Sequence, residues 1–346
     1  MKQQITLKEV AAQAGVSYQT VSKVLNHKAQ VSPETESKIL EAARALGYQP
    51  NQLARSLRSQ RSCLIGYSWF PVPPEHHNPI IDQFVQSMLN AVEGTGYNLL
   101  CFRQPPGTAP VDAYCELVDT LRVDAFVLSD VEFNDPRVIF LNGRHFPFVA
   151  FGRTDQEWDI PYVDVDGAFG IRQVVRHLIE RGHRRIGVLT WPEGSRVGED
   201  RMEGYFTALH DAGIAPQREW ILRGDGVFSF GYDSALHWLD LPVGIRPTAV
   251  VAFNDYMAIG VKQALEDRGL QLGVDMAVTG FDDTPLVKYL TPPLTSVRQP
   301  IWEVGQRIVS MILDLLEERP LLYRHLIMQP ELIIRQSSAN AFEPGE

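Results

Sequence analysis

The sequence has little cysteine and no long apolar run. Its 346 residues include only three cysteines, Cys63, Cys101 and Cys115. Because this odd number lacks the spacing of a metal site, we expect reduced thiols, no structural disulfide and no zinc. Uninterrupted apolar segments of about 18 residues are absent, and the first residues carry no apolar core of an export signal. These absences favour a cytoplasmic protein that does not contact a membrane.

Motifs of common enzyme classes are also missing. The sequence has no Walker-type phosphate loop, no Gly-x-Ser-x-Gly elbow and no His-Glu-x-x-His segment. Asp282 and Asp283 could pass for paired catalytic carboxylates, but adjacent side chains in a loop point apart and seldom act on one bond. We therefore expect a protein that is not an enzyme, with no catalytic residue, cofactor or metal.

The charge is distributed unevenly along the chain. Apolar residues make up 45% and charged residues 21%, and the length predicts two or three globular domains. Residues 1–60 hold eight lysines and arginines against four glutamates, a net +4, so a total of -10 leaves -14 for the remainder. A basic head on an acidic body suggests that the head meets a polyanion. A solvated basic face without a partner would have the same composition.

The first 25 residues carry the signals of two short helices. Thr6 followed by Glu9 is a capping-box pattern, and the apolar or small residues around it share one face of a helix over about 7–14. Gly15 then turns the chain, and Ser17 can cap a second helix. The inward positions of that second helix are Val21, Val24 and Leu25.

The opposite face of the second helix is polar. Its side chains can donate and accept hydrogen bonds along one exposed stripe; they are Tyr18, Gln19, Ser22, Lys23 and Asn26. A short helix, a turn containing glycine and a second helix with such a stripe form a helix-turn-helix, which presents the stripe to the major groove of DNA.

A third helix and a short helical segment complete the head. Ser32 can cap the third helix, Pro33 suits its first position and Gly47 ends it. Residues 51–57 are rich in helix formers but span only about two turns, which is too short for a stable isolated helix in water. We expect this segment to fold only against a partner.

These motifs together resemble the head of the lactose-repressor (LacI/GalR) family of bacterial transcription factors. The similar runs are Thr6–Ala11, Gly15–Asn26, Val31–Thr35, Leu46–Asn51 and Ala54–Leu57. The resemblance implies that Tyr18, Gln19 and Lys23 read base edges of operator DNA. It also implies that backbone-contacting residues are Thr6, Ser17, Ser22, Asn26 and Asn51.

The resemblance makes residues 51–57 a hinge helix that folds when two copies dock in the minor groove. Leu57 is then the wedge that enters a base step and kinks the duplex, whereas the alternative is that it packs the linker against the body. Lys23 stands where an arginine is more usual. Since lysine cannot form a rigid bidentate fork, the base pair it prefers stays open.

The body, residues 61–346, alternates strand-length apolar runs with helical patterns. Predicted helices lie at 80–95 and 167–181, and the predicted strands are 64–67, 99–102, 125–128, 148–151, 186–189, 249–253 and 277–280. Such alternation implies parallel sheets covered by helices, and about 280 residues are too many for one sheet core. We therefore predict a small all-α helix-turn-helix head at 1–60, joined to an α/β body of two parallel-sheet subdomains with a cleft between them.

The body resembles the same family, whose fold is like that of periplasmic sugar-binding proteins. The similar stretches are His177–Gly187, Arg201–Tyr205, Ala212–Ile214, Phe253–Gly260, Gly280–Asp283 and Pro293–Val297. The resemblance implies three chain crossings between subdomains, near 160–165, 290–295 and 322–326. The N-subdomain then comprises about 62–162 and 293–323, and the C-subdomain about 163–292 and 324–340.

The loops that follow the strands should carry the effector chemistry, because open α/β sheets bind ligands outside the carboxyl ends of their strands. The resemblance assigns effector contacts to Asn254, Asp282 and Arg201, whose amide, carboxylate and guanidinium match the mixed polarity of a sugar. The alternatives are a helix cap for Asn254, a loop cap shared with Asp283 for Asp282, and a surface ion pair with Glu199 or Glu203 for Arg201. We also expect contacts from Arg153, Trp158 and Trp191.

The combined expectation is a DNA-binding transcriptional repressor of carbohydrate-utilisation genes that binds a pseudo-palindromic operator and responds to a small sugar. Because the chain ends without leucine heptads, we expect a homodimer. One alternative within the class is a purine or another non-sugar effector. An alternative from another class is a solute-binding protein, which the basic head and the missing export signal disfavour. The effect of the proline-rich loop at 71–77 stays open.

Overall fold

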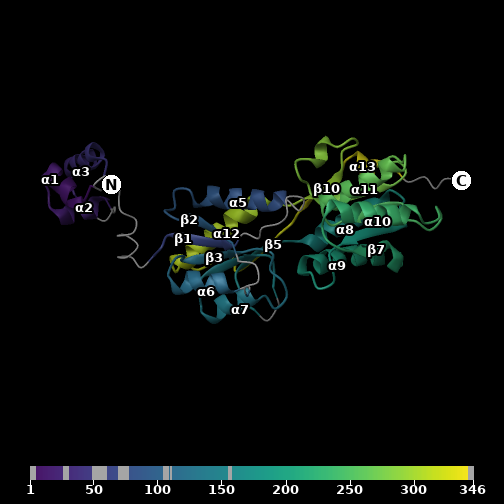
Figure 1. Cartoon of the computed structure of the whole chain (residues 1–346), viewed down its shortest axis with the longest axis horizontal. Coiled ribbons are helices and arrows are strands. Elements are labelled where there is room, and N and C mark those ends of the chain that lie inside the picture. The colour runs from purple at the N-terminus through teal and green to yellow at the C-terminus, as the bar shows by residue number, and fades with distance from the viewer. Residues whose placement is uncertain are drawn as a thin grey trace. The chain divides into compact units, whose positions relative to one another are not determined.

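The computed structural model describes residues 5–25, 31–48, 61–68, 78–103, 109, 111–154 and 158–341. Its contacts separate two units, Met1–Ser62 and Cys63–Glu346, which we call the head and the body (Figure 1). This division falls two residues beyond the predicted one. None of the helices in the described ranges is long and apolar enough to cross a membrane.

The head consists of three helices where the sequence predicted them: α1 (Leu7–Ala14), α2 (Tyr18–Leu25) and α3 (Pro33–Leu46). The Thr6 amide donates to the Glu9 carboxylate (2.6 Å), and the Ser17 hydroxyl accepts from the Thr20 amide (3.1 Å). These caps satisfy donors that each helix start leaves free. The helices close over a small apolar core made by Val10, Ala11, Val21, Val24, Ile39, Ala42 and Ala43.

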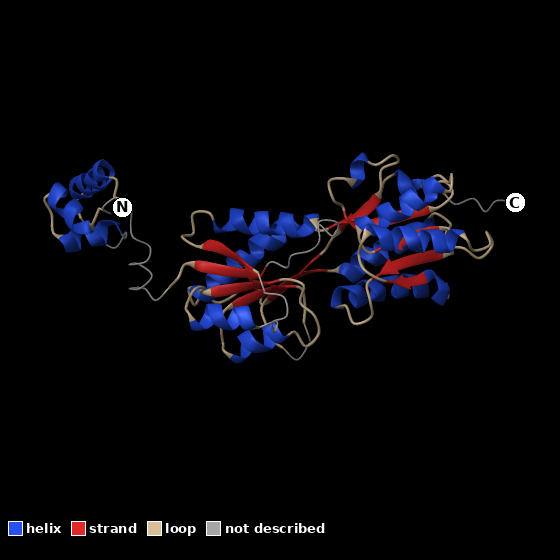
Figure 2. Cartoon of the chain, viewed as in Figure 1, coloured by secondary structure: helices blue, strands red, loops and turns tan. Residues whose placement is uncertain are grey.

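The body contains two six-stranded sheets, each flanked by helices (Figure 2). In the N-subdomain the strand order is β11-β5-β4-β3-β1-β2. Its strands are β1 (Leu64–Ser68), β2 (Asn98–Phe102), β3 (Ala125–Leu128), β4 (Phe148–Phe151), β5 (Tyr162–Val165) and β11 (His325–Met328). Its helices are α5 (Pro79–Val92), α6 (Asp112–Asp119), α7 (Pro136–Gly143) and α12 (Ile301–Leu316).

The C-subdomain sheet has the order β12-β10-β9-β8-β6-β7. Its strands are β6 (Ile186–Thr190), β7 (Ile221–Arg223), β8 (Ala249–Ala252), β9 (Ala277–Asp282), β10 (Thr295–Arg298) and β12 (Glu331–Ile333). Its helices are α8 (Gly167–Glu180), α9 (Arg196–Asp211), α10 (Phe228–Leu239), α11 (Asp255–Asp267) and α13 (Gln336–Ala339). The paired strands are parallel in both sheets, except that β12 runs antiparallel to β10.

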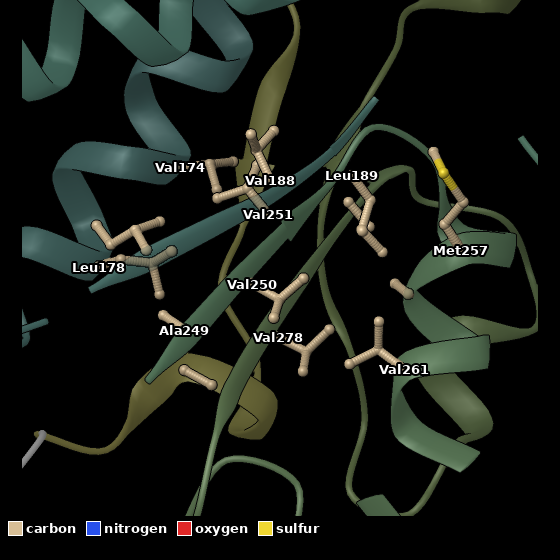
Figure 3. Close-up of a cluster of buried hydrophobic side chains, with 14 of the residues drawn as sticks. Val174, Leu178, Val188, Leu189, Ala249, Val250, Val251, Met257, Val261 and Val278 are labelled. Carbon is tan, nitrogen blue, oxygen red and sulfur yellow. The ribbon is translucent and has the colours of Figure 1, made fainter. Parts of the chain in front are cut away.

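Both faces of the N-subdomain sheet are buried. Along β3, Ala125 and Val127 join the core under α5 and α12, whereas Phe126 and Leu128 join the core under α6 and α7. This continuous apolar run is typical of a parallel strand covered on both sides. In the C-subdomain, α8 and α11 pack apolar side chains such as Val174 and Val261 against strands β6, β8 and β9 (Figure 3).

The chain crosses between the subdomains three times, but later than the resemblance implied. The crossings lie between β5 and α8, between β10 and α12, and between β11 and β12, near residues 166, 299 and 329. The ranges 163–292, 293–323 and 324–340 were therefore wrong at their starts, because β5 pairs with β4, β10 pairs with β9 and β11 pairs with β5. Short strands look alike in sequence, and only their pairing decides to which sheet each belongs.

Glycines let α10 and α11 approach until their backbones touch. A Cβ atom at Gly260 would lie 2.2 Å from the Phe228 carbonyl oxygen, and one at Gly231 would lie 2.1 Å from the Met257 carbonyl oxygen. Backbone atoms cannot rotate away as a side chain can, so any larger residue would separate the two helices.

We predict that Gly260→Ala lowers the free energy of unfolding by about 1–3 kcal/mol, despite the better helix propensity of alanine. The matched control is Gly143→Ala in α7, where an added Cβ meets no atom within 4 Å. Urea denaturation of both variants tests the prediction, and equal stability of the two would contradict the close approach.

Candidate functional site

A cavity of about 560 Å³ lies in the body and is lined by residues of both subdomains. Its walls include the loops that follow β3, β4, β6 and β7, the end of β9, and the beginnings of α9 and α11. This is the position expected of a ligand site in open α/β sheets, outside the carboxyl ends of the strands. Of the six residues predicted to contact an effector, five line it: Arg153, Trp191, Arg201, Asn254 and Asp282.

Arg201 brings a guanidinium into the interior from α9. Its side chain is 6% exposed, lies 3.5 Å over the Phe281 ring and 5.1 Å from the Trp191 ring centroid, and donates through Nη1 to the Phe253 carbonyl. Nε has no hydrogen-bond partner among the described residues. Burial lowers the pKa of Arg201 to about 10, against the attraction of Asp282. The alternative of a surface ion pair is therefore wrong, and Glu199 binds Arg223 instead.

Asp282 ends β9 with a left-handed backbone, at a φ of 115°. One carboxylate oxygen accepts from Gln299 Nε2 at 2.7 Å. Burial raises the pKa of Asp282 to about 6, although the Arg201 charge opposes this rise. The neighbouring Asp283 is turned elsewhere, into ion pairs with Arg298 and Arg335. The side chains of Asp282 and Asp283 therefore point apart, in agreement with the prediction from the sequence.

Asn254 both lines the cavity and caps a helix. Its Oδ1 accepts from the Met257 amide at the start of α11 (2.8 Å), and its Nδ2 donates to the Gly226 carbonyl (2.7 Å). The cap and the cavity position occur together, so the two interpretations of Asn254 are not exclusive.

Arg153 joins the two subdomains through ion pairs. From the loop after β4, its Nε lies 2.6 Å from Asp164 in β5, and its Nη2 lies 2.5 Å from Asp200 in α9. Asp200 also accepts from the Ala168 amide, just beyond the first crossing. Burial alone would lower the pKa of Arg153, but the two carboxylates raise it. The Arg153 guanidinium, which we expected to contact a ligand, is thus bound to two carboxylates of the protein.

A second contact between the subdomains lies at the start of α9. Glu132, in the loop after β3, accepts from the Arg196 amide at 2.7 Å, and the Arg196 guanidinium lies 5.3 Å from the Phe133 ring centroid. A carboxylate at a helix N-terminus meets unpaired amides and the positive end of the helix dipole.

The structure separates the two predicted tryptophans. Trp191 lines the cavity, whereas Trp158 is not among its lining residues and packs against the core under α6 and α7. The assignment of Trp158 to the effector site is not supported by this placement. Sequence reasoning missed Asp130, Glu132, Asp164, Asp200 and Gln299, which also line the cavity. Their position just after strands or beside Arg201 was the available signal.

The head presents the predicted reading stripe to solvent. Tyr18 is 48% exposed, and Gln19 and Lys23 are exposed on the same helix. Ser17 is engaged in its cap, and the Thr6 hydroxyl donates to Glu9 at 2.8 Å. Ser22 is half-buried. The assignments to Asn26, Asn51 and Leu57, the hinge at 51–57 and the loop at 71–77 lie outside the described residues.

Metal ligation finds no support in the described ranges, which hold no group of three or more His, Cys, Asp or Glu placed around an ion. The chemistry of the cavity is instead that of hydrogen bonding, with carboxylate and amide acceptors beside one buried guanidinium.

Comparison with family descriptions gives two matches. Residues 6–51 match "Bacterial regulatory proteins, lacI family", and residues 175–338 match a periplasmic binding protein-like domain. A relative, the HTH-type transcriptional repressor PurR of Edwardsiella ictaluri, is 32% identical over 97% of both chains.

Solved structures agree with these matches. A regulatory protein of the LacI family from Chloroflexus aggregans is 47% identical, with a TM-score of 0.77 over 80% of this chain and 99% of that one. The transcriptional regulator CelR in complex with cellobiose is 28% identical (TM-score 0.73), and the lac repressor dimer bound to operator is 27% identical (TM-score 0.83). Each of these two covers 97% of this chain and 100% of its own.

We predict that Asp282→Asn changes how stability depends on pH. Because the folded state raises the pKa of Asp282, it binds the proton more tightly than the unfolded chain, so this stabilisation is complete below about pH 4 and is lost as the pH rises through about 6. The free energy of unfolding of the parent, relative to Asp282→Asn, should therefore fall by about 1–3 kcal/mol between pH 4 and 7. Asparagine also tolerates the left-handed backbone.

Urea denaturation of parent and variant across this pH range measures the difference. The exposed Asp233→Asn in α10 serves as the control for the removal of a carboxylate. A constant difference between the parent and Asp282→Asn would contradict the raised pKa.

Proposed function

Because this chain belongs to the lacI family of bacterial regulatory proteins and is a DNA-binding transcriptional regulator rather than an enzyme, we propose that it is a cytoplasmic repressor of carbohydrate-utilisation genes. A small sugar in the body cavity controls its affinity for a pseudo-palindromic operator. The observation that carries this proposal is the meeting of Arg201, Asn254 and Asp282 in one cavity formed by both subdomains.

The chemistry of the cavity supports a sugar. Asp282 offers a carboxylate acceptor, and the buried Arg201 keeps an unpartnered Nε donor beside it. The Trp191 ring supplies an apolar surface for sugar C–H groups. A similar solved structure is a complex with cellobiose. A purine effector is the alternative, since a 32% identical relative carries the name PurR.

The exposed stripe of α2 supports operator reading. Tyr18, Gln19 and Lys23 project from one short helix whose apolar face is fixed by the core of the head. In the proposal they contact base edges in the major groove, while Thr6, Ser17, Ser22, Asn26 and Asn51 contact the backbone and Leu57 enters the minor groove.

Control then follows from the contacts between the subdomains. In the proposal, effector shifts the subdomains relative to one another, which changes the spacing of two hinge segments in a dimer and so their ability to fold on DNA. A coupling of about 1–3 kcal/mol changes operator affinity by roughly 5- to 150-fold.

Operator selection from a random duplex library tests the proposal. The expected result is a two-fold symmetric site, bound in preference to scrambled competitor, with an affinity that changes when a mono- or disaccharide is added. The absence of any preferred duplex, with and without sugars, would falsify the repressor assignment.

Gln19→Ala should lower discrimination at particular base pairs of the selected operator by about 1–3 kcal/mol, because a bidentate base contact is lost. The control is Gln13→Ala, an exposed glutamine on α1. Titrations against single-base variants of the operator measure the effect. A loss that is equal for all duplexes would remove Gln19 from the reading positions.

We expect a homodimer, since two-fold symmetric sites are read by two heads. Light scattering should give a mass about twice that of the 38.9 kDa chain. A tetramer or a monomer at micromolar concentration would contradict this expectation.

A further inference from the structure

The cavity contains twice as many carboxylates as guanidinium groups. The lining residues include six carboxylates, Asp130, Glu132, Asp164, Asp200, Asp225 and Asp282, and three guanidinium groups, Arg153, Arg196 and Arg201. Within this set Arg153 pairs with Asp164 and Asp200, whereas Glu132 accepts from the backbone amide of Arg196 and leaves the Arg196 guanidinium without a carboxylate partner in the described ranges. What faces a ligand is therefore a surplus of hydrogen-bond acceptors around Arg196 and Arg201.

Four of the six carboxylates have no ion-pair partner within 4 Å in the described ranges: Asp130, Glu132, Asp225 and Asp282. Asp130 has one side-chain contact there, from the Ser129 hydroxyl at 3.3 Å. The Asp130 side chain is exposed to the cavity rather than packed in a core. An anionic ligand would add another negative charge beside these unpaired carboxylates.

Asp130 is held in position by a strained backbone and a buried ion pair. It lies two residues beyond the end of β3 with a φ of 50°, which a residue with a side chain rarely adopts. The Arg137 Nη2 donates to the Ser129 and Asp130 carbonyls (3.0 and 2.9 Å) and pairs with Asp135 at 2.6 Å. Both partners of that pair are buried. The Arg137 guanidinium therefore fixes the turn that presents Asp130 to the cavity.

Asp130 belongs to the N-subdomain and Asp282 to the C-subdomain, so both subdomains supply carboxylate acceptors. We infer that the effector is an uncharged, hydroxyl-rich molecule without phosphate or carboxylate, and that Asp130 accepts hydrogen bonds from it opposite Asp282. This inference rests on the proposed sugar effector and adds a specificity-determining residue to it. A phosphorylated or oxidised sugar would lose its hydration and meet four unpaired carboxylates, against the two guanidinium groups of Arg196 and Arg201.

A thermal-shift panel of matched pairs tests the charge selection: glucose with glucose 6-phosphate, cellobiose with cellobionate, and adenosine with adenosine monophosphate, with hypoxanthine added. Stabilisation by an uncharged sugar and not by its anionic partner is the expected result. A larger shift with any anionic member would overturn the inference. Stabilisation by adenosine or hypoxanthine alone would overturn the sugar effector of the proposed function and, with it, the hydroxyl-rich ligand, while the preference for uncharged ligands would stand.

Asp130→Asn tests the residue, because asparagine keeps the shape and tolerates the left-handed backbone. Calorimetry with the stabilising sugar should show binding weakened about 10-fold or more, since a hydrogen bond to a charged acceptor is lost. The anionic partner should be excluded less strongly than in the parent. Asp119→Asn, an exposed carboxylate of the same subdomain, is the control and should bind as the parent does.

Asp130→Gly provides a second variant that relieves the strained φ and is expected to fold at least as stably as the parent. It should lose the same affinity as Asp130→Asn. Parent-like affinity in both folded variants would remove Asp130 from the site.

Discussion

Arg201 carries a charge into the interior of the body. A buried charge requires hydrogen-bond acceptors, opposite charge or aromatic rings around it, and the residues near the cavity provide them. The Arg201 guanidinium lies between the Trp191 and Phe281 rings, donates to the Phe253 carbonyl and is attracted by Asp282. Burial still outweighs these interactions, since the pKa of Arg201 is lowered and that of Asp282 is raised. A hydroxyl-rich ligand that donates to Asp282 and accepts from Arg201 would supply the hydrogen bonds that both groups lose with water.

The contacts that join the subdomains are of two kinds. Arg153 with Asp164 and Asp200 lies beside the first crossing, where the chain can bend with little displacement. Glu132, in the loop after β3, binds the backbone amide at the start of α9. Because both contacts border the same cavity, a ligand that alters the cavity acts on the relative pose of the two sheets. In the proposed function, this would be the physical link between effector binding and a change elsewhere in a dimer.

Much of the fold could be predicted because its signals are local. Strands Ala125–Leu128 and Phe148–Phe151 have the predicted bounds, and Ser17 and Asp166 cap the predicted helices. The site could be predicted only in part. Arg201, Asn254 and Asp282 came from the family resemblance, whereas Asp130 and Asp200 carry no motif. A carboxylate in a loop looks the same in sequence whether it faces solvent or a cavity.

The sequence by itself determined the helix-turn-helix, the alternation of strands and helices, and the family, because each follows from residues close together in the chain. The tertiary structure alone decided which sheet β10 and β11 join, that Arg153 is paired with carboxylates rather than free for ligand, and that Trp158 packs into a core. These outcomes depend on strand pairing and on contacts between distant segments. No local pattern encodes such contacts, since the same short strand or lone side chain can be satisfied by several partners.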